Sequence, residues 1–305
     1  MYSKRFTYYE WPEALFQIRR LKREMMIEET AWGTFPAKTV AVDGKTELGV
    51  SVLQHGLLAG EVFRQFRTLR RWNALDELLP ETLVGLIGAH DVGKANPLFF
   101  NKLLKHVSEE DKRLWFDAFD VDPSWFRLLE SGLSERMKEK LEIRHEAVSV
   151  AVLLELHANH LLAHETVGCH HEKELTQVLG VEAYLGGPLW QNGRIALTRE
   201  ILKELGGNEQ WLQFSDSICE NKVIRKLWAG ALVLSDWIAS RKENSYPQGE
   251  QREIASKLLQ DAGFEHVTPV KKTDFSDLFG YAPRRLQAEV SSLYKGPGIY
   301  VLEAP

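Results

Sequence analysis

The chain has 305 residues, of which 44% are hydrophobic and 27% are charged, an ordinary composition for a globular protein of one large domain or two small ones. Its 38 Lys and Arg residues against 43 Asp and Glu residues give a formal charge of −5, which excludes a protein that coats nucleic acid by bulk positive charge but allows a local basic groove. The two cysteines, Cys169 and Cys219, exclude a disulfide framework and a four-cysteine zinc site.

Taken in chain order, the predicted elements are almost all helices. Met1–Glu10 lacks the apolar core of a signal peptide, and no apolar run approaches the roughly 20 residues of a membrane span, so we expect a cytoplasmic protein with no membrane partner. Asp43-Gly44 lies between two short runs of β-type residues and predicts a two-residue hairpin turn. Apolar residues then recur at spacings of three and four, which predicts helices over Leu53–Leu69, Glu81–Ala89, Glu146–Leu162 and Val223–Ala239.

The pattern predicts an all-α main body from about Val50 to Arg241. Polar segments that contain Pro and Gly follow it, over residues 242–251 and 266–272. We therefore expect one domain over residues 1–250 and a separate segment over residues 251–305.

Ten histidines stand out, several of them beside acids or beside each other. His90-Asp91 follows an apolar helical segment, at a point where a helix end lets both side chains turn toward one place. Imidazole together with carboxylate suits a divalent ion such as Mn, Ni, Co, Fe or Mg, and a carboxylate can bridge two ions. His55 lies in the preceding predicted helix. Asp236 lies within an apolar helix, where a cation or hydrogen-bond donors must compensate its charge, so a purely structural role for it stays open.

A second group of histidines follows. His145 begins a predicted helix, and His170-His171 comes after that helix ends. Three imidazoles can supply one ion with nitrogen ligands and leave open positions for solvent or a phosphate oxygen. Taken alone, these residues fit a helix cap and a surface loop better than a metal site.

The combined motifs carry a resemblance that the single residues do not. His55, His90-Asp91 and Asp236 occur in the order that resembles the HD superfamily of metal-dependent phosphohydrolases. The longer motifs, over about residues 55–240, resemble the HD nuclease of the CRISPR-associated nuclease-helicase of type I systems: His90-Asp-Val-Gly-Lys-Ala-Asn-Pro-Leu-Phe-Phe100, Arg144-His-Glu146, His170-His171 and Leu234-Ser-Asp-Trp-Ile-Ala-Ser240. The resemblance implies an all-α HD domain. Glu172 departs from the family pattern, which usually has Gly after the His pair, and this puts the local turn in question.

The C-terminal segment carries a second resemblance. Phe275–Gln287 resembles the Q-motif that precedes a superfamily-two helicase core, and Tyr300–Pro305 resembles the strand that leads into a phosphate-binding loop. The glycine-rich loop with its Lys would come next. We therefore interpret residues 251–305 as a linker and the start of a truncated helicase domain, and we expect no complete ATP-driven motor in this chain.

The resemblance also implies roles for the candidate residues. Two ions a few Å apart can activate a water and stabilise the leaving oxygen in phosphodiester hydrolysis. Asp91 would bridge them, and Lys94, one turn later, would contact a scissile phosphate or orient Asp91; Ser235 is a candidate donor to a ligand. Because imidazoles bind metal only when neutral, we expect activity to fall below about pH 6. The first ion would be held by His55, His90, Asp91 and Asp236, and the second by Asp91, His145, His170 and His171.

The substrate that the resemblance implies is single-stranded DNA, cut endonucleolytically and then degraded further. The partners that it implies are the Cascade surveillance complex and the protein's own helicase domain. Trp72, Phe99 and Phe100 are candidates for stacking on the strand, although most such aromatic residues belong to a core. Two alternatives stay open: an HD phosphohydrolase acting on nucleotides or cyclic dinucleotides, and a catalytically inactive module that docks on Cascade. The Q-motif argues against the first, and the complete set of seven candidate ligands argues against the second.

Overall fold

The computed structural model describes residues 32–42, 45–69, 78–105, 144–171, 187–241 and 250–264, short stretches at 107–109, 112–113, 280–285 and 287–289, and the single residues 117, 185 and 276. The chain divides into two compact units, Met1–Glu265 and His266–Pro305.

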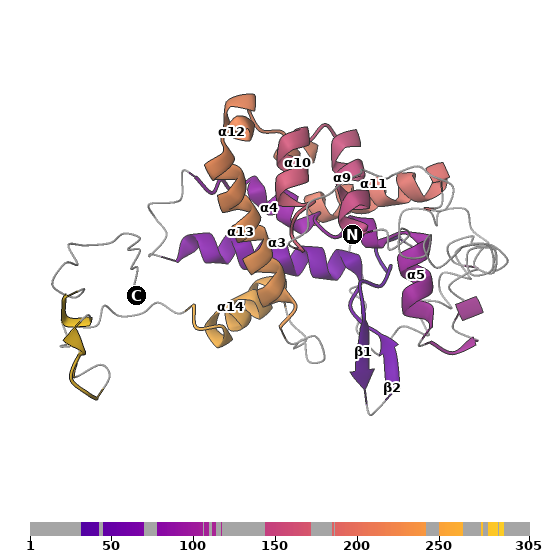
Figure 1. Cartoon of the computed structure of the whole chain (residues 1–305). Coiled ribbons are helices and arrows are strands. Elements are labelled where there is room, and N and C mark those ends of the chain that lie inside the picture. Colours follow the sequence, from indigo (N-terminus) through magenta and orange to yellow (C-terminus); the bar gives the residue numbers. More distant parts are fainter. Residues whose placement is uncertain are drawn as a thin grey trace, which may run out of the picture. The chain divides into compact units, whose positions relative to one another are not determined.

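The described residues of the first unit form helices and one hairpin (Figure 1), which confirms the all-α prediction. None of the helices in the described residues combines the length and the apolar character that a membrane span requires. In chain order the helical elements are α3 (Val52–Thr68), α4 (Leu83–Gly88), η3 (Val92–Lys94), α5 (Pro97–Leu104), α9 (His145–Glu155), α10 (His160–Thr166), α11 (Gly187–Glu204), η5 (Glu209–Leu212), α12 (Asp216–Glu220), α13 (Lys222–Ala239) and α14 (Gln251–Asp261).

The predicted hairpin is present. Strand β1 (Thr39–Val42) pairs antiparallel with β2 (Lys45–Leu48), and Val42 lies opposite Lys45 at the closed end. This register leaves a two-residue connection, Asp43-Gly44, which lies outside the described residues.

Helix α3 is the central element of the first unit. Its start is fixed by a capping box, in which Ser51 Oγ accepts from the Gln54 amide at 3.1 Å and the Gln54 side chain accepts from the Ser51 amide at 3.0 Å. Apolar residues at helical spacing, among them Leu58, Val62 and Phe66, then face the core. The cap therefore places the first turn of α3, which carries His55, at a defined position in the fold.

Helices α3 and α4 approach each other closely at glycines. A Cβ atom on Gly56 would lie 2.3 Å from the carbonyl oxygen of Gly88, the last residue of α4. Because no side chain separates the two backbones there, His55 on α3 comes close to the residues that follow α4.

The first unit extends beyond the expected boundary at residue 250 and ends at Glu265. The reason is α14, which packs against α3 and contributes Ile254, Ala255, Leu258 and Leu259 to the core. Residues 251–264 therefore belong to the helical unit, and the assignment of the segment after residue 265 to a helicase domain stays a prediction.

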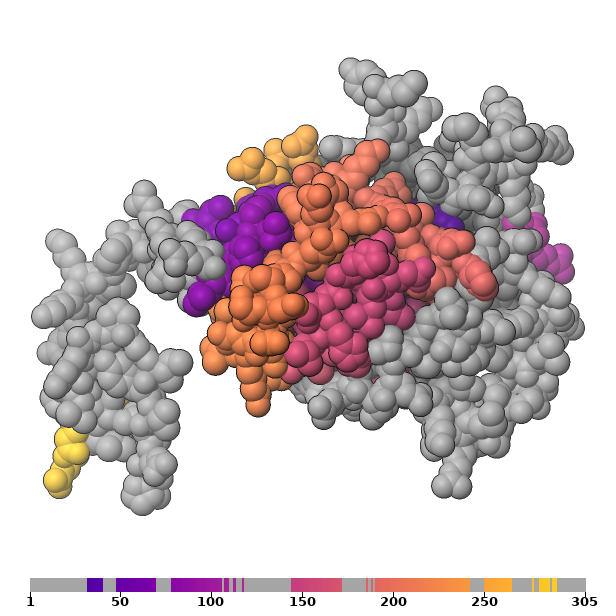
Figure 2. Space-filling model, turned by 90° about the horizontal axis from the view of Figure 1, so that it is seen from above, coloured from indigo at the N-terminus to yellow at the C-terminus, as the bar shows by residue number. Residues whose placement is uncertain are grey.

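Helix α13 packs on both α3 and α10. Figure 2 shows the surface of α13, in orange, between those of α3, in purple, and of α9 and α10, in magenta. The buried face of α13 includes Trp228, whose indole Nε1 donates to the Leu78 carbonyl at 2.6 Å, and Leu232. This packing fixes the last turn of α13, and with it Asp236, beside the first turn of α3.

Candidate metal centre

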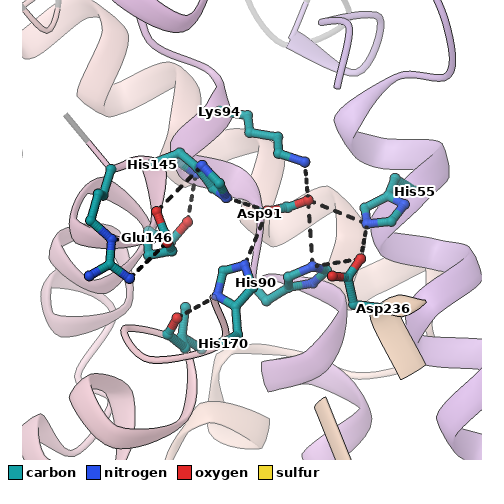
Figure 3. A network of polar contacts seen from close by, with 12 residues as sticks. His55, His90, Asp91, Lys94, His145, Glu146, His170 and Asp236 are labelled. Carbon is teal, nitrogen blue, oxygen red and sulfur yellow. Dashed lines mark hydrogen bonds and ion pairs between the residues drawn. The ribbon is translucent and has the colours of Figure 1, made fainter. Parts of the chain in front are cut away.

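The fold brings all seven candidate ligands together in two neighbouring groups. Figure 3 shows these ligands except His171. They come from five segments that are far apart in the sequence: the first turn of α3, the link between α4 and η3, the start of α9, the residues after α10, and the last turn of α13. In that order the ligands are His55, His90 and Asp91, His145, His170 and His171, and Asp236.

The link between α4 and η3 turns both of its polar residues toward the centre. Helix α4 ends at Gly88, and Asp91 has φ −105° and ψ 7°, in the sparsely populated bridge region where functional residues often occur. Because the chain has left the α-helix here, the side chains of His90 and Asp91 converge in the way that the sequence predicted.

Backbone carbonyls set the tautomers of two histidines. His90 Nδ1 lies 2.7 Å from the Ile87 carbonyl oxygen, and His170 Nδ1 lies 2.6 Å from the Val167 carbonyl oxygen. A carbonyl can only accept, so each Nδ1 carries the proton and donates it. The Nε2 atom of each neutral ring is therefore left with a free lone pair, the state that a metal ligand needs.

The first ligand group consists of His55, His90, Asp91 and Asp236, whose ligand atoms lie within 4.8 Å of one another. His55 Nε2 lies 3.0 Å from Asp236 Oδ1 and 3.3 Å from Asp91 Oδ2, and His90 Nε2 lies 3.6 and 3.5 Å from the same two oxygens. Two ligand atoms bound to one ion at about 2.0–2.2 Å lie about 3.0–3.6 Å apart for bond angles between the octahedral and tetrahedral values. The spacing of this group thus fits one divalent ion.

The second ligand group consists of His145, His170 and His171, which also have ligand atoms within 4.8 Å of one another. His145 Nε2 lies 3.0 Å and His170 Nε2 lies 3.7 Å from Asp91 Oδ1. One oxygen of Asp91 therefore faces the first group and the other faces the second group. This is the arrangement of a bridging carboxylate.

Several buried atoms of the two groups lack a hydrogen-bond partner. They are Nδ1 of His55, the ring nitrogen that does not face the carboxylates, and four atoms that converge on one space: Nε2 of His90, His145 and His170 and Oδ1 of Asp91. A buried polar atom left unpaired costs about 1–3 kcal/mol, so four together need an explanation. Lone pairs that converge on one space are satisfied by a cation, and the donor set therefore fits divalent metal binding.

The electrostatics keep the carboxylates ionised. Burial would raise the pKa of Asp91, but the Lys94 ammonium, 2.6 Å from Oδ2, and His90 outweigh it and hold that pKa well below its ordinary value. Burial would also raise the pKa of Asp236, but its hydrogen bond with His55 leaves the pKa far below the ordinary range. Both carboxylates are therefore charged at neutral pH.

Two histidines of the second group, His145 and His171, have lowered pKa values and are neutral at the same pH. Burial lowers the pKa of His145 to about 4, despite the opposing effect of Asp91. Burial and the neighbouring His170 lower the pKa of His171 as well. Ionised carboxylates beside neutral imidazoles are the protonation states that bind a divalent ion.

Lys94 contacts the bridging carboxylate directly. Besides its ion pair with Asp91, its ammonium lies 5.8 Å from the centre of the Phe99 ring, which in turn lies 5.9 Å from the His145 ring. These contacts fit the expectation that Lys94 orients Asp91; the expected contact with a phosphate stays a prediction.

The three candidate stacking residues differ in position. Phe100 is fully buried and packs with Phe35 and Trp190, so it is a core residue. Phe99 is half-buried beside His145, and Trp72 lies outside the described residues. Of the three, only Phe99 is placed at the metal centre by the structure.

The expected donor Ser235 does not serve the site. Its hydroxyl donates to the Ala231 carbonyl within α13 at 2.7 Å, and it is Ser240, one turn after Asp236, that donates to Asp236 Oδ1 at 3.3 Å. Sequence reasoning missed Ser240, although its spacing of four residues from Asp236 places it on the same helix face.

Sequence reasoning also assigned no role to the neighbours of His145. The Glu146 carboxylate is buried, lies 3.5 Å from His145 Nδ1 and accepts from Arg144 Nε and Nη2 at 3.1 and 2.9 Å. The motif Arg144-His145-Glu146 thus forms a small polar cluster behind the second group. Glu172 lies outside the described residues.

Gly93 joins the two groups. Its amide donates to Ser149 Oγ on α9 at 2.9 Å, and a Cβ atom on it would lie 2.0 Å from the His145 carbonyl oxygen and 2.5 Å from the Ser149 nitrogen. Only a glycine lets η3, next to Asp91, approach the start of α9 this closely.

Comparisons with known proteins agree with this geometry. A family model described as Cas3, HD domain, matches residues 38–245, which include all seven candidate ligands. The CRISPR-associated nuclease/helicase Cas3 of Streptococcus thermophilus is 23% identical over 266 residues, which cover 73% of this chain and 26% of that protein. The CRISPR-associated endonuclease/helicase Cas3 of Thermus thermophilus is 26% identical over 263 residues, which cover 77% of this chain and 26% of that protein.

The chain spans about a quarter of the length of these curated relatives. No solved structure matches it significantly. The family model covers well over half of the chain and all of the candidate metal centre, and the chain therefore belongs to the Cas3 HD-domain family.

Proposed function

We propose that this chain is a metal-dependent nuclease that hydrolyses the phosphodiester bonds of single-stranded DNA in type I CRISPR interference. The observation that carries the proposal is the position of the Asp91 carboxylate, with one oxygen toward His55 and His90 and the other toward His145 and His170. A carboxylate shared in this way between two sets of ligands is typical of centres that hold two divalent ions for phosphodiester cleavage.

We assign the following roles to the residues of this chain. Asp91 and Asp236 supply negative charge at neutral pH, and the imidazoles supply lone pairs, among them His145, which burial keeps neutral. Lys94 holds Asp91 in place and puts a positive charge where an anionic substrate would approach. Two divalent ions, of Mn, Ni, Co, Fe or Mg, would supply water activation and stabilisation of the leaving oxygen.

The access to the centre supports a single strand as substrate. His55, His90 and His170 are buried, whereas the side chains of Asp236, His145 and Lys94 are 13–16% exposed and His171 is exposed. Partial exposure leaves these groups within reach of solvent, and we propose that a flexible single strand brings its phosphodiester backbone to them more readily than a duplex does.

The relatives are named as nuclease/helicase and endonuclease/helicase, and we extend this to the partners of the present chain. We propose that it works in the cytoplasm beside a helicase domain, whose start is the segment after residue 265, and that the Cascade surveillance complex delivers its DNA.

Digestion of circular single-stranded DNA tests the proposed function, because a circle has no ends and its loss reports an internal cut. The purified chain is incubated without ATP in Mn, Ni, Mg or chelator, beside the variants Asp91→Ala and Asp216→Ala. Asp216 is an exposed acid on α12 and serves as the matched control. We expect cleavage that requires metal and falls on the order of 10³-fold in Asp91→Ala only. Equal cleavage by Asp91→Ala, or hydrolysis of nucleotides or cyclic dinucleotides in place of DNA, contradicts the proposal.

A further inference from the structure

Trp237 is the most exposed aromatic side chain in the part of the chain that the structure describes, at 62%. Trp32, Trp190 and Trp228, by contrast, are buried in the core. The Trp237 ring contacts no other aromatic ring among the described residues, and its indole N–H has no hydrogen-bond partner there. The packing of the first unit therefore gives no reason for a large aromatic residue at this position.

The position of Trp237 relative to the metal centre is defined by its neighbour. Asp236 turns its carboxylate into the centre, and successive Cα atoms lie about 3.8 Å apart while side chains on a helix diverge by about 100°. Trp237 therefore lies on the outward face of α13 at the edge of the centre. The Asp236 side chain is itself 13% exposed, so solvent reaches this ligand next to Trp237.

A positive charge, Arg241, follows just after the end of α13. Arg241 comes four residues after Trp237 and two residues after Ala239, the last residue of α13, and its amide donates to the Ile238 carbonyl at 3.2 Å. The Arg241 guanidinium is held at the surface by its bond from Nη1 to the Asp261 carbonyl at the end of α14, at 2.8 Å. Exposed aromatic rings and nearby positive charges are the groups with which proteins bind single strands, by stacking on bases and contacting phosphates.

We propose that Trp237 is a stacking platform for a nucleobase of the strand whose phosphodiester bond lies at the metal centre. This inference rests on the proposed function and adds a base-recognising subsite to it. Stacking needs only the flat face of a base, so the subsite accepts any of the four bases and requires that a base be present. Trp237 is then a substrate-binding residue and takes no part in holding metal.

The test compares a strand that has bases with one that has none. Binding of fluorescent oligothymidylate and of an abasic deoxyribose-phosphate strand of equal length is measured in chelator, and cleavage of both is measured in Mn²⁺. The variants are Trp237→Ala, Trp237→Phe and, as the matched control, Val223→Ala. Val223 is 76% exposed on the same helix, about 21 Å away along its axis.

We expect Trp237→Ala to weaken oligothymidylate binding about 5- to 100-fold and to leave abasic binding and Mn²⁺ affinity unchanged. Trp237→Phe should recover most of the loss, and Val223→Ala should bind both strands as the unmodified chain does. Unchanged oligothymidylate binding in Trp237→Ala, an equal loss on both strands, or an equal loss in Val223→Ala overturns the inference.

The same experiment separates this inference from the proposed function. If the chain binds oligothymidylate through Trp237 but cuts neither strand, the stacking subsite stands and the nuclease proposal fails. If the chain cuts both strands equally and Trp237→Ala changes nothing, the nuclease proposal stands and the stacking subsite fails.

Discussion

The two ligand groups of the metal centre differ in how firmly the fold holds them. In the first group His55, His90 and Asp91 are almost fully buried and the Asp236 side chain is 13% exposed, and these residues lie on α3, directly after α4, and on α13, which pack together in the core. In the second group only His170 is buried; His145 is half-buried and His171 is exposed. Asp91 faces both groups, so the two differ in their surroundings while sharing one carboxylate.

This difference has a consequence for metal binding. A ligand set that the core already holds loses little conformational freedom when an ion binds, whereas exposed side chains must be ordered at that moment. The first group should therefore bind its ion tightly, and the second group should bind an ion that exchanges with solution. Each prediction below tests whether the two groups can be separated.

The largest effect is expected where the two groups are joined. In Gly93→Ala the new Cβ would lie 2.0 Å from the His145 carbonyl oxygen. The backbone fixes the position of both atoms, so no change of side-chain rotamer can relieve the clash. Helix α9 must shift away from η3, which separates His145 from Asp91. We expect nuclease activity to fall on the order of 10²-fold or more and the free energy of unfolding to fall by about 1–3 kcal/mol. A cleavage assay at saturating Mn²⁺ measures the first effect, and urea unfolding measures the second.

Gly230→Ala provides the control for Gly93→Ala. Gly230 lies inside α13, and a Cβ atom there would meet nothing within 4 Å. Alanine should stabilise the helix by about 0.5–1 kcal/mol and leave cleavage unchanged. Similar losses of stability in both variants would show that the contact between η3 and α9 is not the cause.

The second prediction compares one ligand from each group. His55→Ala removes a fully buried ligand and should abolish binding of the tight ion at any practical metal concentration, together with about 10²-fold or more of activity. His171→Ala removes an exposed ligand and should raise the Mn²⁺ concentration for half-maximal cleavage about 10-fold, with activity recovered at saturation. Cleavage measured across an Mn²⁺ series distinguishes the two. If high Mn²⁺ rescues both variants equally, the groups do not differ in the way that their burial indicates.

The third prediction concerns pH. The folded-state pKa of His145 is lowered to about 4 from the ordinary 6.5, so the folded chain binds this proton only well below the pH at which the unfolded chain does. Stability therefore falls as the pH drops from about 6.5 toward 4, and the ring can bind metal over most of that range. We expect the second ion to be retained at pH 5.5 and lost near pH 4. Histidines with an ordinary pKa would already release it below about pH 6. Mn²⁺ stoichiometry by equilibrium dialysis measures this, and release of the second ion between pH 7 and 6 contradicts it.

Most of the first group could be predicted from the sequence because its signals are local. His90-Asp91 follows an apolar helical run, and Asp236 interrupts another. Because apolar spacing predicts these helices correctly, polar residues at such positions are easily recognised in the sequence. The helices themselves follow from apolar spacing, and the hairpin follows from a turn dipeptide between β-type runs. His145, His170 and His171, by contrast, were placed together by resemblance to a family, since their own neighbourhoods indicated a cap and a surface loop.

The features that the sequence did not predict depend on contacts between segments. The end of the first unit at Glu265 depends on the packing of α14 against α3. The sequence of Gln251–Asp261 alone does not indicate this packing. The close approach of Gly93 to His145 depends on how α9 packs against η3. The contact between Glu146 and His145 requires that the Glu146 carboxylate be buried, whereas an acidic side chain in the first turn of a helix is usually exposed. Each of these is decided by tertiary packing.

The smallest effect is expected at the hydroxyl that supports Asp236. In Ser240→Ala, Asp236 Oδ1 loses a donor at 3.3 Å, while its contact with His55 remains. Removal of a residue that hydrogen-bonds to a metal ligand typically lowers metal affinity 10- to 100-fold. Because the hydrogen bond from Ser240 is long, we expect a smaller loss of affinity for the tight ion, about 3- to 10-fold. Ser235→Ala is the matched control, because the Ser235 hydroxyl bonds only within α13 and its loss should leave Mn²⁺ affinity unchanged. Calorimetric Mn²⁺ titration of both variants decides which serine supports the first group, and a greater loss in Ser235→Ala would restore the assignment made from sequence.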